Sequence, residues 1–427
     1  MTSFDIHNAD NAQLQALQQQ LQQAFDQLKA AGLNLDLTRG KPGSEQLSLS
    51  NALDGILAGN YTSDSGTDTR NYGGLDGLPE CKAMFADIMQ VTAEEILIGG
   101  NSSLTLMYQA VLFAWLFGYG DKAKAWKDDG KTSFLCPVPG YDRHFAICEA
   151  FGINMISVPM NEHGPDMDSV EKLLREDKSI KGMWCVPRFS NPSGIVYSDE
   201  TVDRIARLGQ IAASNFRVFW DNAYAIHSFT SDAPALAPIM DACRRHGTED
   251  SVLQFGSTSK VTFAGAGLAY MAASKANLAA FGKHLGMSSI GPDKINQLRH
   301  LRFFNGHTSF AEHMKKHAAL LKPRFDIVLD KLAGHFSNSD ALQWTVPEGG
   351  YFVSVDTRPG LAKRVVALAG ELGVKLTPAG ATFPYGKDPQ DSNIRIAPSF
   401  PSLADIDKAM DVFVLCVKLA TVEQALA

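Results

Sequence analysis

One lysine lies in a sequence context that suits covalent chemistry at an amine. Lys260 belongs to the polar loop 256–263, between the apolar run 252–255 and the small-residue run 264–268. Burial between apolar walls lowers the pKa of an ammonium group, and a neutral amine condenses with an aldehyde to form a Schiff base. Lys260 is therefore the first candidate for a catalytic residue.

Further polar and aromatic side chains follow apolar runs elsewhere in the chain. They are Asn101, Ser102, Ser103, Tyr141, Asn191, Asp221, Tyr224 and, in the loop of Lys260, Ser257. Taken singly, each is explained as a turn residue, and the first three also as helix caps. The alternative is a ligand site, because helix N-termini bind anions and ligands lie beyond the carboxyl ends of parallel strands. Their repetition after successive runs favours one shared site.

Seven short apolar runs must position these residues. They cover residues 96–98, 133–136, 155–158, 183–186, 218–220, 252–255 and 268–271. Helical stretches separate most of them, which predicts a largely parallel sheet covered by helices on both faces. The predicted fold class is therefore α/β, with a mostly parallel seven-stranded sheet in a large domain and a smaller α/β domain beside it.

The chain on either side of this region completes the predicted domains. Leucine and phenylalanine recur every three or four residues through 11–30, which predicts an amphipathic helix. The segment 37–43 is either a linker or a backbone that passes close to a bound anion. We expect residues 1–45 to pack as a helix and arm with the small domain, residues 46–315 to form the large domain, and residues 316–427 to form the small one.

Composition excludes several classes of protein. A net charge of −7 over 427 residues, without a Lys/Arg block, argues against a nucleic-acid partner. The six cysteines form no C-x-x-C pair and are predicted to be reduced core thiols. Residues 1–5 lack the charged and apolar regions typical of a secretion signal, and the most apolar stretch, 110–117, is too short to cross a membrane. We expect a cytoplasmic protein.

The ordered motifs resemble the class I aminotransferases of fold type I, which use pyridoxal phosphate, and most closely aspartate aminotransferase subgroup Ic. The resemblance covers about residues 37–402. It implies that Lys260 holds the cofactor as a Schiff base and moves the substrate proton, and that Asp221 keeps the pyridine nitrogen protonated. Asn191 and Tyr224 are expected to donate hydrogen bonds to the cofactor's 3-oxygen, and Tyr141 to stack on its ring.

The resemblance also implies how phosphate, substrate and a second subunit are bound. The phosphate would be held by Asn101, Ser102, Ser103 and Ser257. Tyr72 would reach it from the neighbouring subunit of a homodimer, and Arg395 would bind the substrate α-carboxylate through its planar fork. Many relatives carry an arginine eight residues after the lysine, where this chain has Leu268. Neutral hydrogen-bond donors, the helix dipole or another cation must then bind the phosphate in place of that arginine. No metal is implied.

The expected reaction moves the amino group of aspartate or glutamate to a 2-oxo acid such as 2-oxoglutarate. A second carboxylate needs a cation, because burying it unpaired is costly. The sequence offers Arg39, Lys41, Arg188, Lys294, Arg299 and Arg302. Arg39 is favoured, since it adjoins Gly40, whose backbone we expect near the substrate.

Other outcomes of the same chemistry are a broad-range aromatic or aminoadipate aminotransferase and a β-lyase. A non-enzymatic alternative is a pyridoxal-phosphate-binding regulator, which is disfavoured because only about 40 residues precede the resemblance, too few for a DNA-binding domain. A nicotinamide dehydrogenase is also disfavoured. The pair Gly265 and Gly267 lacks the third glycine of that motif and precedes a predicted strand instead of following one.

Overall fold

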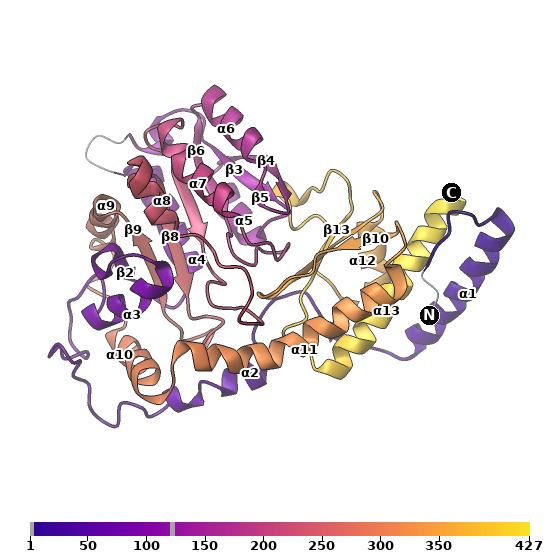
Figure 1. The fold of residues 1–427 in the computed structure, drawn as a ribbon, viewed down its shortest axis with the longest axis horizontal. Coiled ribbons are helices and arrows are strands. Elements are labelled where there is room, and N and C mark those ends of the chain that lie inside the picture. Colours follow the sequence, from indigo (N-terminus) through magenta and orange to yellow (C-terminus); the bar gives the residue numbers. More distant parts are fainter. Residues whose placement is uncertain (1–3, 120–123) are drawn as a thin grey trace.

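A computed structural model describes residues 4–119 and 124–427, and its largest sheet has eight strands (Figure 1). In spatial order they are β2 Ile96–Ile98, β9 Ala269–Ala273, β8 Val252–Ser257, β7 Arg217–Asp221, β6 Ile180–Cys185, β3 Ser133–Val138, β4 Asn154–Asn161 and β5 Gly164–Pro165. Strands β8, β7, β6, β3 and β4 are parallel, whereas β9 is antiparallel to both neighbours. All seven predicted runs contribute strands, and β5 adds a short antiparallel edge.

Helices cover both faces of this sheet, which explains why its strands are almost continuously apolar (Figure 1). One face packs against α4 Ser103–Leu116, α5 Asp142–Ala150 and α9 Lys275–Leu285, and the other against α6 Met167–Glu176, α7 Asp199–Arg207 and α8 Ile239–His246. Successive residues of β6 alternate between the two hydrophobic clusters: Trp184 faces one, while Met183 and Cys185 face the other. Every position of such a strand is therefore buried.

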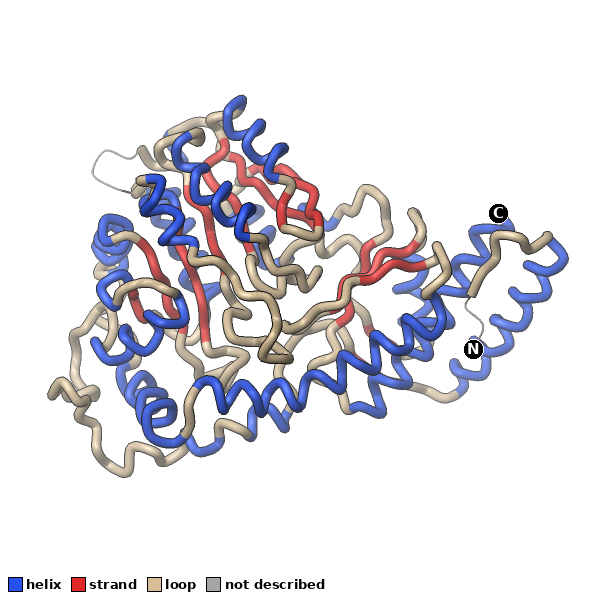
Figure 2. Tube along the Cα trace, in the orientation of Figure 1, coloured by secondary structure: helices blue, strands red, loops and turns tan. Residues whose placement is uncertain are grey.

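A smaller antiparallel sheet lies beside the large one (Figure 2). It consists of β10 Leu342–Trp344, β11 Val353–Thr357 and β13 Asn393–Ile396, and it shares a hydrophobic cluster with α11 Phe310–Phe336, α12 Ala362–Glu371 and α13 Leu403–Leu426. The N-terminal helix α1 Asn11–Ala30 packs on α13 and joins the same cluster. Next to it, β1 Leu35–Asp36 pairs with β12 Val374–Lys375. The two ends of the chain thus build one core.

Helix α1 has the limits that its apolar spacing predicts. Asp10 caps it by accepting a hydrogen bond from the Gln13 N–H, and the Gln13 side chain accepts one from the Asp10 N–H. Gly32 follows its last turn with a φ of +63°, a left-handed conformation that suits glycine. Leu14, Leu21 and Phe25 are its buried face.

The remaining elements connect these two parts. They are the helices α2 Ser44–Ser48, α3 Pro79–Met89 and α10 Lys294–Arg302, and short 3-10 or π turns at 51–53, 93–95, 126–128, 208–210, 249–251, 303–307 and 384–386. Helix α11 runs unbroken across the predicted boundary at residues 315–316, and the domain limits stay a prediction. Within 4–119 and 124–427, none of the helices combines the length and apolar character that crossing a bilayer requires.

Candidate active site

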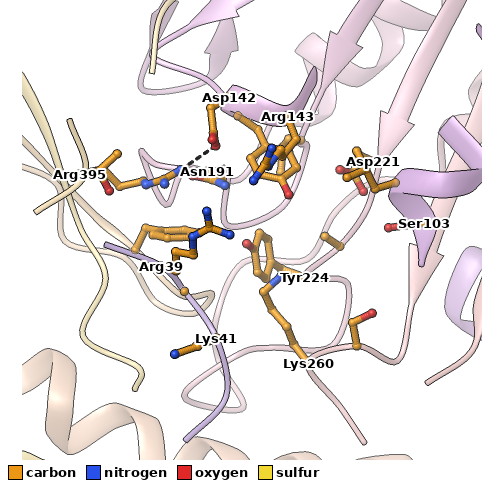
Figure 3. A pocket seen from close by; sticks show the side chains of 18 of the residues that line it. Arg39, Lys41, Ser103, Asp142, Arg143, Asn191, Asp221, Tyr224, Lys260 and Arg395 are labelled. Carbon is orange, nitrogen blue, oxygen red and sulfur yellow. Dashed lines mark hydrogen bonds and ion pairs between the residues drawn. The ribbon is translucent and has the colours of Figure 1, made fainter. Parts of the chain in front are cut away.

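A cavity of about 640 Å³ lies between the carboxyl ends of β6, β7 and β8 and the small sheet (Figure 3). This is the sheet edge where the sequence predicted a site. Of the predicted site residues, all but Asn101 and Tyr72 line it: Arg39, Gly40, Ser102, Ser103, Tyr141, Asn191, Asp221, Tyr224, Ser257, Lys260 and Arg395. One cavity thus collects side chains from segments more than 350 residues apart along the chain.

The loop after β8 presents the amine of Lys260 to this cavity. The Nζ atom lies 5.2 Å from the ring centroid of Tyr224 and 5.6 Å from that of Tyr351. Loss of hydration lowers the pKa of Lys260, the carboxylate of Asp221 opposes that shift, and the charge of Arg395 reinforces it. The amine therefore gives up its proton more readily than a lysine in water, as Schiff-base chemistry requires.

Hydrogen bonds from buried side chains fix the backbone of this loop. The Lys260 carbonyl oxygen accepts from the Tyr351 hydroxyl at 3.4 Å and lies 3.3 Å from Nε2 of His227. The next carbonyl, that of Val261, lies 2.7 Å from Nε2 of His313 on α11. Because three buried side chains hold two consecutive carbonyls, the position of the lysine is set by the core and not by the loop alone.

Asp221 ends β7 with its carboxylate buried beside the cavity. Its Oδ2 accepts a hydrogen bond from Nε2 of His144 at 3.0 Å, and the His144 ring stacks on Trp184 with centroids 4.3 Å apart. Its Oδ1 is buried without a partner among the described residues. Leaving a buried acceptor unpaired costs about 1–3 kcal/mol, and more when it is charged. This oxygen therefore marks where an N–H group of a ligand fits.

Tyrosine and asparagine side chains complete the wall near this carboxylate. Burial raises the pKa of Tyr141 to about 12, and nearby carboxylates add to the shift. Burial also raises the pKa of Tyr224 well above its ordinary value. Both hydroxyls therefore keep their protons at neutral pH and are available as donors. Asn191 accepts from Nη1 of Arg395 at 3.2 Å through its amide oxygen, which leaves the amide nitrogen as a donor.

One end of the cavity is built from serine hydroxyls. Ser102 immediately precedes α4, but its side chain makes no capping hydrogen bond, so capping does not explain this residue. Ser103 lines the cavity in the first turn of the same helix. In the loop after β8, Ser257 donates to Ser259 at 3.1 Å. These hydroxyls, with the N-terminus of a 14-residue helix, suit an anion.

Two neighbours of this end hold loops in place instead of lining the cavity. Asn101 donates from Nδ2 to the Gly265 carbonyl at 3.2 Å, and its predicted contact with a phosphate stays a prediction. Leu268, where many relatives have an arginine, is buried, and its N–H donates to Oγ1 of Thr258 at 2.8 Å. Apart from Lys260, the described polar side chains at this end are neutral, so hydroxyls and helix N–H groups are the donors available to an anion.

Arg395 reaches the opposite end of the cavity from β13 (Figure 3). It is 5% exposed, and its Nη1 lies 3.4 Å from Oδ1 of Asp142 while its Nη2 donates to the Thr38 carbonyl at 3.4 Å. Its Nε has no partner among the described residues. These contacts are long and incomplete, so the guanidinium group is able to take a carboxylate through two parallel hydrogen bonds.

Gly40 allows the N-terminal segment to pass close to this arginine. A Cβ atom at this position would lie 2.5 Å from the ring of Phe352, a distance that atoms in contact do not tolerate. The same ring lies 4.8 Å from the guanidinium carbon of Arg395. A side chain at position 40 would therefore displace Phe352 and, through it, the arginine.

The cations proposed for a second carboxylate divide into two groups. Arg39 and Lys41 line the cavity. The others do not line it, and each donates to a main-chain carbonyl elsewhere: Arg188, Lys294, Arg299 and Arg302. Only the three-dimensional fold separates these groups, because all six positions are equally cationic in the sequence.

Sequence reasoning missed several residues that line or support the cavity. Asp142, Arg143 and His144 follow Tyr141 directly and form the first turn of α5, and Ser259 immediately precedes Lys260. A signal was present, since polar side chains at a helix start beside a predicted site residue share its edge of the sheet. Conversely, Tyr72 lies outside the cavity with 83% of its surface exposed, and its predicted role stays a prediction.

Comparison with known proteins gives a consistent picture. The sequence matches the family model described as aspartate amino-transferase over residues 9–427. It is 48% identical to a putative aminotransferase of Mycolicibacterium smegmatis over 413 residues, 96% of each chain. It is 43% identical over 424 residues to an aspartate aminotransferase of Corynebacterium glutamicum, covering 99% of this chain and 98% of the relative. The structure matches that of an aspartate transaminase from the same organism with a TM-score of 0.95 at 42% identity, covering 99% and 100% of the two chains.

The contact between His144 and Asp221 generates a testable prediction. His144→Phe keeps a ring against Trp184 but removes the donor to Oδ2. A hydrogen bond to a charged group contributes about 1.5–3 kcal/mol, so we expect turnover to fall roughly ten- to a hundredfold without loss of the fold. Initial rates and thermal melting check this, with the exposed His163→Phe as control. Turnover within twofold of the parent protein would show that His144 does not orient Asp221.

Proposed function

The chain belongs to the aspartate amino-transferase family, and on this basis we propose that it transfers the amino group of aspartate or glutamate to a 2-oxo acid such as 2-oxoglutarate. That it is an aminotransferase follows from the family. The dicarboxylic substrate is our proposal, and one observation carries it: the fork of Arg395 and the unpaired guanidinium of Arg39 line the same cavity as Lys260 and Asp221.

The family implies pyridoxal phosphate, and the residues of the cavity fit this cofactor. The unpaired Oδ1 of Asp221 suits a protonated pyridine nitrogen, and the serine end suits a phosphate group. When bound, the cofactor supplies an aldehyde for amines and a protonated ring that withdraws electrons from the substrate α-carbon. We propose that Asp221 holds the ring nitrogen, that Tyr141 lies against the ring, and that Asn191 and Tyr224 donate to its 3-oxygen.

The phosphate is assigned to the serine hydroxyls. Ser102 and Ser103 offer donors without a competing carboxylate in the lining of that end, Ser257 adds one when its hydroxyl turns from Ser259 to the phosphate, and Asn101 holds the adjacent loop. The helix N-terminus of α4 adds N–H groups and a favourable dipole. This arrangement supports phosphate binding without the arginine that Leu268 replaces.

Lys260 is proposed to bond the cofactor aldehyde and, once released, to carry the substrate proton. Its lowered pKa makes a neutral amine available, and the rings of Tyr224 and Tyr351 stabilise the amine when it is charged. The Lys260 amine thus alternates between base and acid. Its backbone stays in place because the Tyr351 hydroxyl donates a hydrogen bond to the Lys260 carbonyl.

Recognition of the substrate is assigned to arginines. Arg395 is proposed to take the α-carboxylate, since its Nε is unpaired and its contacts with Asp142 and Thr38 are long. A second carboxylate requires a second cation in the lining, and Arg39 supplies one whose side chain has no partner among the described residues.

The six free, buried cysteines support the expectation of a reducing, cytoplasmic location.

The substrate proposal predicts a ranking of amino donors. With 2-oxoglutarate as acceptor, we expect kcat/KM for aspartate to exceed those for alanine and phenylalanine by about tenfold or more, because only aspartate pairs with both arginine sites. The measurement is a steady-state comparison of the three donors on one preparation. If alanine or phenylalanine is better by tenfold, about 1.4 kcal/mol in the wrong direction, the broad-range alternative replaces the dicarboxylate proposal.

We also propose a homodimer in which Tyr72 reaches the phosphate of the neighbouring subunit. Tyr72 is 83% exposed. Two apolar side chains near it in the fold are also exposed, Met287 at 84% and Ile290 at 63%. The segment that carries them packs on the Tyr72 loop, since Lys294 donates to the Gly73 carbonyl. Exposed apolar surface of this kind supports contact with a second copy.

Mixing inactive variants tests the role of Tyr72. Lys260→Ala and Tyr72→Phe each damage a different part of the site, so hybrid dimers should regain activity at the one site that has both residues intact. Activity of the mixture after verified subunit exchange is the measurement, and each variant exchanged with itself is the control. No recovery would place both residues in the site of one subunit and contradict the proposal.

A further inference from the structure

Arg143 is a cation of the cavity that neither the sequence motifs nor the proposed function has assigned. It lines the same space as Arg395, and its exposed side chain makes no hydrogen bond or ion pair with another residue of 4–119 or 124–427 (Figure 3). Exposed arginines elsewhere in the protein often have acidic partners, as Arg175 has Glu171 and Arg207 has Asp203. Its neighbour Asp142 contacts Arg395 and not Arg143.

The place of Arg143 in its helix gives it no structural benefit. It is the second residue of α5, where the helix dipole is positive and favours an acidic side chain such as Asp142. A cation in the first turn is mildly unfavourable, and no ion pair in the described structure offsets it. This position instead places a positive charge at the carboxyl edge of the sheet, next to the cavity residues Tyr141 and Asp142.

Arg39 and Arg143 have matching positions on two sides of Arg395. Arg395 touches the Thr38 carbonyl and the Asp142 carboxylate, each at 3.4 Å, and the next residue along each segment is one of the two arginines. Both arginines line the cavity and both lack partners among the described residues. A short dicarboxylate whose first carboxylate is held by Arg395 therefore meets guanidinium groups from two further segments in the same cavity.

Resting on the proposed function, we propose that Arg143 determines specificity for dicarboxylic substrates by holding the second carboxylate together with Arg39. A guanidinium group donates two parallel hydrogen bonds to one carboxylate, and two such groups satisfy both of its oxygens. Lys41 is less suited. Its ammonium lies 3.8 Å above the ring of Phe400, which already stabilises its charge. The subsite thus joins the N-terminal segment to the first turn of α5.

Calorimetric titration of the holoenzyme with succinate and with propionate tests this subsite without turnover. Succinate carries two carboxylates and propionate one, and neither has an amino group to react. We expect Arg143→Gln to weaken succinate binding about ten- to a hundredfold, the loss expected for hydrogen bonds to a charged group, with propionate changed less than about twofold. Arg143→Lys keeps the charge but not the planar fork, so its affinity for succinate should lie between those of the parent protein and Arg143→Gln. Arg175→Gln, on α6, is the control.

Kinetics and a double-mutant cycle give the second measurement. In Arg143→Gln, kcat/KM for aspartate should fall by a similar factor while that for alanine stays within about twofold. If Arg39 and Arg143 share one carboxylate, their Gln variants should be non-additive for succinate binding. Additive losses would overturn the shared subsite.

The outcomes separate this inference from the proposed function. A parent enzyme that prefers succinate to propionate, together with Arg143→Gln affinity within twofold of the parent, overturns the role of Arg143 and leaves the dicarboxylate proposal standing. A parent enzyme that binds the two acids equally and uses alanine as well as aspartate overturns both.

Discussion

A buried carboxylate with one oxygen satisfied and one left open is the constraint on which the site depends. His144 donates to Oδ2 of Asp221 and stacks on the ring of Trp184, whereas Oδ1 has no partner among the described residues. An unpaired charge of this kind is costly in the empty protein. In the proposed function a protonated ring nitrogen pairs with this oxygen, and the strand end, the start of α5 and the stacked ring then act together to hold the carboxylate in place.

The lining of the cavity carries a positive net charge, whereas the whole protein is negatively charged. The chain has a net charge of −7, yet arginine and lysine side chains dominate the lining, with Asp142 and Asp221 as its carboxylates. Such a cavity favours anionic ligands, and the charge of Arg395, which shares the space with Lys260, adds to the lowering of the Lys260 pKa. Desolvation is the larger contribution to the lowered pKa, and Asp221 keeps the shift from going further.

The sequence predicts the parts of this molecule whose signal is local. The seven apolar runs and helix α1 are visible because periodicity and burial go together, and most site residues were found because they follow strands. His144 and Arg143 were missed because their importance arises from where the first turn of α5 meets β7 and β13 in space. For the same reason, the sequence favoured Arg39 only through its neighbour Gly40 and did not show that Lys294 and Arg299 donate to carbonyls of distant segments.

The most direct test of the account is the identity of the lysine that bonds the cofactor. Borohydride reduction of the protein with pyridoxal phosphate should fix the pyridoxyl group to Nζ of Lys260, found by peptide mapping, and Lys260→Ala should bind the cofactor without becoming labelled. The lowered pKa of the amine, the fixed loop and the open oxygen of Asp221 all predict that result. Label on a different lysine, or unchanged labelling in Lys260→Ala, would contradict the account at its centre.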